Sequence, residues 1–180
     1  MTAIKNKQMV VEYKSAIGQD SHCFEPARSK KPLVLAGITI PGCVGLKGNS
    51  DADVVLHALT NAISGVSGVN VLGSISDDMC LKKGITNSNA YLQKALQTLD
   101  GYVLSHISVS IEAHRPRLSG HIDAMKDSLA KLCRLKTNQI GITATTGEGL
   151  TSFGKGLGMQ AFVVITAVSK TASFTPEATD

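Results

Sequence analysis

The sequence predicts a single α+β domain in which helices pack on one side of a mixed β-sheet. Two observations predict this class: segments of alternating apolar residues, typical of strands, are interspersed with segments of helical period, and no repeat or linker divides the chain. The length of 180 residues suits one domain and is sufficient to bury a full core. We expect residues 11–170 to form the domain, with residues 1–10 and 171–180 as flexible ends.

Two segments near the N-terminus predict strands. Residues 11–18 form a run rich in β-formers that ends where the stretch GQDSHCF begins. Residues 33–42 predict a pair of strands that is bent at Gly37 and closed by Pro41, because glycine and proline commonly mark turns.

A change of period then marks the first helix. Ser50 and Asp53 have the spacing of a capping box, which is a start signal for a helix. The apolar stripe that follows is Leu56, Leu59, Ile63 and Val66. Because this stripe faces the core, we expect the polar side chains on the opposite face of the helix. They are Asp53, His57, Thr60 and Asn61.

The second half of the chain adds two helices and three strands. A helix follows Asn87 and stops at Gly101, and strict alternation over residues 106–113 predicts a half-buried strand. A third helix and two closing strands complete the domain. The apolar residues of this helix are Ile122, Met125, Leu129 and Leu132. The two strands are residues 140–144 and 159–167. The resulting order is β-β-β-α-α-β-α-β-β.

Composition and charge exclude several classes of function. Only 4% of the residues are aromatic, and there is no Trp, which argues against a surface that stacks nucleic-acid bases. The net charge of +4 is spread along the chain and suits a small anionic ligand better than a duplex. The longest apolar run, residues 161–168, is too short to span a bilayer. We expect a protein that binds neither nucleic acid nor membrane.

The spacing of the four cysteines indicates the cellular compartment in which the protein works. Cys23, Cys43, Cys80 and Cys133 form no CxxC pair and no disulfide-dense pattern. The N-terminal residues also lack the apolar core of a signal peptide. We therefore expect reduced thiols in a cytoplasmic protein, with Cys23 buried.

The stretch GQDSHCF contains two candidate metal ligands. Asp20 and His22 are two residues apart, so on a strand their side chains share one face, whereas Ser21 points the other way. His57 lies on the polar face of the first predicted helix and could be the third ligand. A single His in such a position is more often hydrogen-bonded than metal-bound. Together, one carboxylate, two imidazoles and an open position match a zinc ion that polarises a substrate.

The glycine-rich residues 143–158 form a second candidate site. Small residues and hydroxyls allow backbone N–H groups to approach phosphate oxygens, and Glu148 could hold a second cation such as Mg²⁺ through the phosphates. Residues 149–155 also spell GxxxxGK, which lacks the final hydroxyl residue of a P-loop, and a β-like run follows in place of a helix. A glycine-rich hairpin turn is the alternative for residues 154–158.

Five motifs together resemble the 2-C-methyl-D-erythritol 2,4-cyclodiphosphate synthase family over residues 14–170. They are GQDSHCF, LAGITIP, SDADVVLHALT, AHRPRL and ATTGEGL, in the family's order and close to its spacing. The resemblance implies a homotrimer of the cyclodiphosphate synthase type with active sites between neighbouring subunits. It implies a phosphorus–oxygen lyase of non-mevalonate isoprenoid biosynthesis. In that reaction the 2-phosphate of a cytidine-diphosphate-linked substrate attacks the β-phosphorus, and CMP leaves.

The resemblance also implies roles for individual residues. Asp20, His22 and His57 correspond to the zinc ligands, and Glu148 to the residue that holds Mg²⁺ or Mn²⁺. Asn49 and Thr146 take the catalytic positions. The implied substrate-binding residues are Asp20, Ser21 and His22; Asn49 and Ser50; Val71, Leu72 and Gly73; Ser76, Asp77, Asp78, Met79 and Cys80; Ala113, His114, Arg115, Pro116, Arg117, Leu118 and Ser119; and Thr145, Thr146, Gly147, Glu148, Ser152 and Lys155.

The chain departs from the family's pattern at several of these positions. Asn49 stands where the family usually has His, Val71 where it has Asp, and Lys155 where it has Arg. Two alternatives therefore stay open. One is a non-catalytic trimeric relative that binds metal or isoprenoid phosphate. The more remote one is a P-loop-like nucleotide-binding protein built on residues 149–155.

Overall fold

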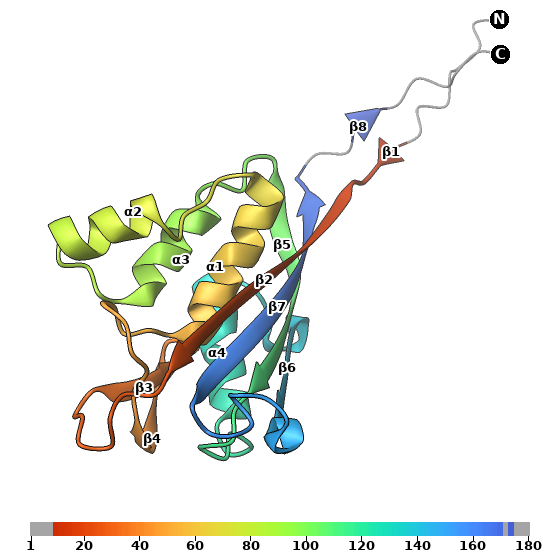
Figure 1. The fold of residues 1–180 in the computed structure, drawn as a ribbon. Coiled ribbons are helices and arrows are strands. Elements are labelled where there is room, and N and C mark those ends of the chain that lie inside the picture. Colours follow the sequence, from red (N-terminus) through yellow and green to blue (C-terminus); the bar gives the residue numbers. More distant parts are fainter. Residues whose placement is uncertain (1–8, 171–172, 175–180) are drawn as a thin grey trace, which may run out of the picture.

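The computed structural model describes residues 9–170 and 173–174. Most of the two ends expected to be flexible lies outside these described residues. Within the ends, β1 (Met9–Val10) pairs antiparallel with β8 (Ser173–Phe174). Figure 1 shows this short pair at one end of the domain.

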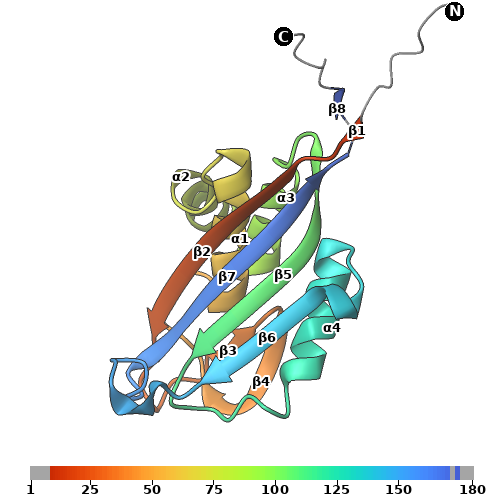
Figure 2. The same cartoon turned by 90° about the vertical axis from the view of Figure 1, so that its right-hand side faces the viewer.

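A four-stranded mixed sheet with the order β2-β7-β5-β6 forms the centre of the domain. β7 is antiparallel to both of its neighbours, whereas β5 and β6 are parallel. The bounds are Tyr13–Cys23 for β2, Tyr102–Glu112 for β5, Ile140–Thr145 for β6 and Gly158–Ser169 for β7. Figure 2 shows this sheet face-on, with the helices behind it.

Helices cover one face of the sheet, which confirms the predicted α+β class. They are α1 (Val54–Ser67), α3 (Ser88–Leu96) and α4 (Ile122–Cys133). The sequence missed a short α2 (Ser74–Asp77) that continues into a π-helix (Asp78–Lys82), because segments this short show no period. Among the described residues, no helix has the length and apolar content that crossing a membrane requires.

The predicted strand pair is a separate two-stranded hairpin, β3 (Pro32–Leu35) and β4 (Ile38–Val44). Ala36 and Gly37 form its tight turn with φ values of 53° and 79°. The prediction that Pro41 closes the hairpin is wrong, because β4 continues to Val44. Pro41 lies where the pairing register shifts, and a bulge tolerates a residue without an N–H group.

Strand β2 extends five residues further than predicted. It ends at Cys23, so Asp20 and His22 lie within the strand and face the helices. The following residue, Phe24, still bridges to Leu46. Cys23 belongs to the opposite face and is exposed, so the expectation of a buried thiol is wrong.

The start of α1 also differs from the prediction. Asp53 is itself the N-cap, and its carboxylate accepts hydrogen bonds from the N–H groups of Val55 and Leu56. The same carboxylate accepts from Ala36 and Gly37 in the hairpin turn, at 3.0 and 2.6 Å. Asp53 therefore joins the helix to the β3–β4 hairpin, and the expected capping box with Ser50 is not formed.

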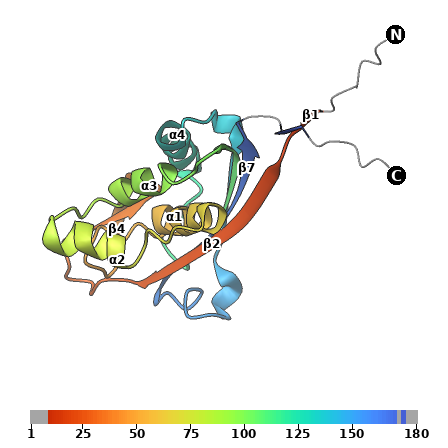
Figure 3. The same ribbon diagram turned by 90° about the horizontal axis from the view of Figure 1, so that it is seen from above.

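The polar face of α1 is buried as deeply as its apolar stripe. Asp53, His57 and Thr60 are all under a tenth exposed. The reason is that α1 lies between β2 and α3, as Figure 3 shows from above. Thr60 satisfies its hydroxyl by donating to the Leu56 carbonyl at 2.8 Å.

Small residues let α1 and β2 approach each other closely. A Cβ atom added to Gly18 would lie 2.0 Å from the Ala58 carbonyl oxygen and 2.3 Å from the Ala62 nitrogen. The strand backbone therefore rests directly on the helix backbone. This contact fixes the distance between the candidate ligands on β2 and the one on α1.

Candidate metal centre and phosphate loop

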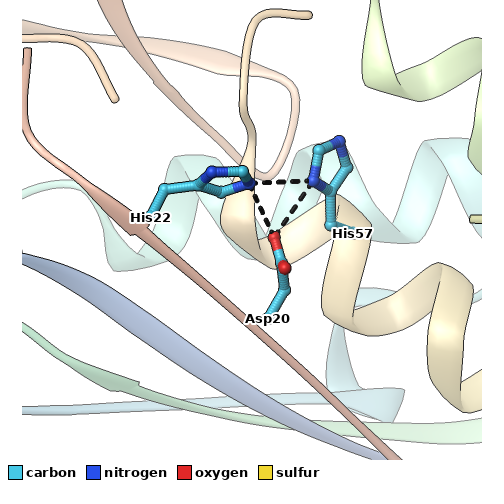
Figure 4. A group of neighbouring side chains, drawn as sticks. All are labelled: Asp20, His22 and His57. Atoms are coloured by element: carbon cyan, nitrogen blue, oxygen red, sulfur yellow. Dashed lines mark hydrogen bonds and ion pairs between the residues drawn. The ribbon is translucent and has the colours of Figure 1, made fainter. Parts of the chain in front are cut away.

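Asp20, His22 and His57 converge on one point between β2 and α1. The Oδ2 atom of Asp20 lies 2.9 Å from His22 Nε2 and 3.0 Å from His57 Nδ1. The two nitrogens are 3.3 Å apart. Figure 4 shows the three side chains pointing toward one another. They are the one group of three or more His, Cys, Asp or Glu residues in the described chain that could hold a metal ion.

The triangle of donor atoms has the size that a zinc ion requires. Tetrahedral zinc with ligands at about 2.0–2.1 Å sets those ligands about 3.4 Å apart. The observed sides of 2.9, 3.0 and 3.3 Å need to expand only slightly. The Asp20 and His22 side chains are each 22% exposed, so the site is open on one side to a further ligand.

The carboxyl group of Asp20 is held in its charged form. Burial alone would raise its pKa, but hydrogen bonds from His22 and His57, together with their charges, outweigh burial and lower the pKa to about 2. Asp20 is therefore ionised at neutral pH, as a metal ligand must be.

The glycine-rich segment forms an exposed loop between β6 and β7. Gly147, Glu148 and Gly149 all have positive φ values, from 50° to 73°. The hydroxyl of Thr146 donates to Glu148 Oε1 at 3.1 Å. The N–H groups of Gly147 and Glu148 donate to the hydroxyl oxygens of Thr145 and Thr146, at 3.2 and 3.5 Å, so hydrogen bonds within the segment hold its turns. The loop leads into β7 and not into a helix, so the P-loop alternative is not favoured.

Two residues that the sequence analysis missed hold this loop. Thr151 donates its hydroxyl proton to Glu112 at the end of β5, and its oxygen accepts the Gly154 N–H at 3.0 Å. The Glu112 carboxylate also fills the space next to Gly147, where an added Cβ atom would lie 2.0 Å from Oε1. No local pattern marks Glu112, because its partners Gly147 and Thr151 lie 35 and 39 residues further along the chain.

A cavity of about 470 Å³ lies beside the loop. Of residues 113–119, all but Arg115 line it, together with Thr145 and Thr146. Arg115 instead lies over the ring of Phe24, 4.8 Å from its centroid. The structure therefore brings two of the predicted substrate segments to one pocket.

The other predicted substrate residues lie around α2 and the loop before α1. Val71 is fully buried in the core, so its side chain is not available to a ligand. Ser76 is also buried, and its hydroxyl is used by the backbone of Gly73. Asn49 is exposed, and its carbonyl accepts a hydrogen bond from the Cys80 thiol at 3.4 Å.

The metal triad and the loop lie at the same end of the sheet. His22 pairs with Met159 and Cys23 with Gly158, which directly follows the loop. On the loop itself, Ser152 and Lys155 are exposed. One end of the sheet thus carries a carboxylate–imidazole triad, a glycine-rich loop and a pocket.

Comparison with known proteins gives consistent matches over most of the chain. The model of the YgbB family matches residues 13–168. The 2-C-methyl-D-erythritol 2,4-cyclodiphosphate synthase of Chlamydia muridarum is 43% identical over 157 residues, which are 87% of this chain and 88% of that protein. The synthase of Chlamydia felis is 41% identical over 157 residues, with 87% and 89% covered.

Solved structures agree with this result. The bifunctional IspDF from Campylobacter jejuni superposes with a TM-score of 0.81 at 32% identity, and the match covers 90% of this chain and 44% of that one. A CDP-bound form of 2C-methyl-D-erythritol-2,4-cyclodiphosphate synthase gives a TM-score of 0.75 at 34% identity, with 84% and 98% covered.

Proposed function

The chain belongs to the YgbB family, and on that premise we propose that it is an active cyclising enzyme of non-mevalonate isoprenoid biosynthesis. It converts 4-diphosphocytidyl-2-C-methyl-D-erythritol 2-phosphate to 2-C-methyl-D-erythritol 2,4-cyclodiphosphate and CMP. The class is phosphorus–oxygen lyase, and the compartment is the cytoplasm. The observation that carries the proposal is the triangle of Asp20, His22 and His57, in a chain 43% identical to a named synthase.

The triad is proposed to hold zinc. One carboxylate and two imidazoles with an open fourth position suit that ion, which would supply Lewis-acid polarisation of a phosphate group. Glu148 is proposed to hold Mg²⁺ or Mn²⁺ through the phosphates, since its carboxylate is on the exposed loop next to Thr146.

The remaining groups bind and align the substrate. The pocket lined by residues 113, 114 and 116–119 is proposed to take the cytosine, and the loop residues 145–148 are proposed to take the diphosphate. A bond forms between a 2-phosphate oxygen and the β-phosphorus, while the bond from that phosphorus to the bridging oxygen breaks and CMP leaves with the electron pair. No general base is needed, because the attacking phosphate is already an anion. Alignment of two anionic groups is the main task of the protein.

We propose the homotrimer that the family resemblance implies, and the uncovered face of the sheet supports a subunit interface there. Ile17, Phe162 and Val164 lie on neighbouring strands β2 and β7 and are 64%, 37% and 43% exposed. In Figure 2 no element of the described chain covers this face. Apolar side chains in the middle of an open sheet commonly mark a subunit interface. Sedimentation equilibrium should give a mass of three 18.9-kDa chains.

Phosphorus NMR tests the reaction directly. Metal-replete protein is incubated with the cytidine-diphosphate-linked substrate, and we expect the cyclic diphosphate and CMP to appear in equal amounts. The matched control is the His22→Ala variant, which should release no CMP. A wild-type protein that binds zinc yet releases no CMP would contradict the proposal and favour a non-catalytic relative.

A further inference from the structure

His57 has a second polar contact on the side away from Asp20. Its Nε2 atom lies 2.8 Å from the hydroxyl oxygen of Ser88. Ser88 is the first residue of α3 and has no exposed surface. The two atoms therefore meet where water has no access, and each must find its partner within the protein.

The direction of this hydrogen bond follows from the next residue. The Ser88 hydroxyl also contacts Oδ1 of Asp51, and a carboxylate can only accept. The single hydroxyl proton of Ser88 thus goes to Asp51, and its oxygen accepts the Nε2–H of His57. Nε2 is thus committed to Ser88, and Nδ1, which contacts Asp20 Oδ2 at 3.0 Å, is the ring atom left to bind a cation placed between Asp20 and His22.

Asp51 is itself held in place by the backbone. Its Oδ2 atom accepts the Ser88 N–H at 3.0 Å, and its own N–H donates to the Thr86 carbonyl at 2.8 Å. The ring of Tyr91 packs against His57, with centroids 6.1 Å apart. The imidazole is therefore fixed in orientation, with Nε2 as the donor to Ser88 and Nδ1 toward Asp20.

We propose that Ser88 and Asp51 are positioning residues of the metal site, which orient His57 so that Nδ1 faces a divalent cation such as zinc. The inference rests on the metal site of the proposed function and not on the cyclisation reaction. Hydrogen bonds to the second nitrogen of a metal-bound imidazole fix its tautomer and raise its basicity, and their loss costs about 10–100-fold in metal affinity.

A purely structural role is the competing explanation. The Asp51–Ser88 contacts also connect the loop before α1 to the start of α3. Under this explanation, losing them would lower the stability of the protein and leave its zinc affinity unchanged. Asn87 offers a matched control, because it caps the same helix end through the Asn89 N–H at 2.8 Å and has no hydrogen bond to His57. The Asn87→Ala variant should lose about 1 kcal/mol of stability and keep its metal affinity.

The experiment measures zinc affinity by competition with a chromophoric chelator in the full-length wild type, Ser88→Ala, Asp51→Asn and Asn87→Ala. Cobalt absorption spectra of the same proteins report the ligand geometry. We expect the zinc Kd of Ser88→Ala to rise at least tenfold with an altered cobalt spectrum. For Asp51→Asn we expect a rise of about threefold or more, because the amide is a weaker acceptor than a carboxylate. Asn87→Ala should match the wild type.

The outcomes distinguish a failure of the positioning role of Ser88 and Asp51 from a failure of the metal site itself. An unchanged zinc Kd in Ser88→Ala would overturn the positioning role while leaving the metal site intact, as would an equal loss in Asn87→Ala. If Ser88→Ala fails to fold, Asp51→Asn decides in the same way. A wild-type protein that binds no zinc would overturn the metal site itself, and with it this inference.

Discussion

Replacing Gly18 with Ala should damage the fold and the metal site together. The added Cβ would lie 2.0 Å from the Ala58 carbonyl oxygen, whereas real contacts of this kind are not closer than 3.0 Å. Strand β2 and helix α1 must therefore separate by roughly 1 Å, and overpacking against rigid backbone costs about 3 kcal/mol. The same shift would lengthen the 3.0 Å distance from His57 to Asp20. Sites of this kind tolerate displacements of only about 0.5 Å, so we expect zinc affinity to fall at least tenfold.

Urea denaturation of metal-free protein and a zinc competition titration measure the two effects. The control is Gly141→Ala on β6, where an added Cβ would lie 3.9 Å from its nearest neighbour, the Ser108 hydroxyl. That variant should stay within about 1 kcal/mol of the wild type. A Gly18→Ala protein with wild-type stability and wild-type zinc affinity would refute the idea that close backbone contact sets the site geometry.

Three further predictions follow from the contacts of single side chains. In metal-free protein, Asp20 has a folded-state pKa of about 2, below its ordinary 3.8, so the stability it contributes is present above pH 4 and is lost as pH falls toward 2. The stability gap to Asp20→Asn, about 2 kcal/mol, should therefore close over that range in urea denaturation; a constant gap would contradict it. Asp53→Asn places an NH₂ group against a backbone donor and should lose about 2–3 kcal/mol of unfolding free energy by calorimetry; an unchanged stability would argue against the cap. Thr151→Val releases Glu112 from the loop and should lower kcat for CMP release about tenfold at unchanged zinc affinity; a normal kcat would argue that the Thr151–Glu112 hydrogen bond does not hold the loop for catalysis.

The metal triad was predictable because its signals are local. Asp20 and His22 are two residues apart, and the period of a strand puts them on one face whatever the rest of the fold does. His57 lies on the polar face of the predicted helix, one turn after Asp53 and one turn before Asn61. Their convergence at about 3 Å depends on the tertiary structure. The family resemblance implied that the three residues form one site, and the structure brings their donor atoms together.

The burial of the polar face of α1 could not be predicted from its pattern. An amphipathic helix signals one buried face, and only the packing of β2 and α3 around α1 buries the other. The small residues Gly18, Ala58 and Ala62 permit this approach, but small residues have no unique meaning in a sequence.

Contacts between distant segments were also invisible in the sequence. Ser88 lies 31 residues after His57 and 37 after Asp51, and no spacing rule connects them. The same holds for Glu112 and Thr151, which are 39 residues apart. The homotrimer and the role of Glu148 stay predictions, because both concern partners that a single chain does not contain.

Anomalous diffraction at the zinc edge, from crystals of zinc-replete protein, tests the central claim most directly. We predict one strong peak per chain, about 2.0–2.2 Å from Asp20 Oδ2, His22 Nε2 and His57 Nδ1. No peak at this point, or a peak coordinated by other residues, would contradict the assignment of the metal centre and the function built on it.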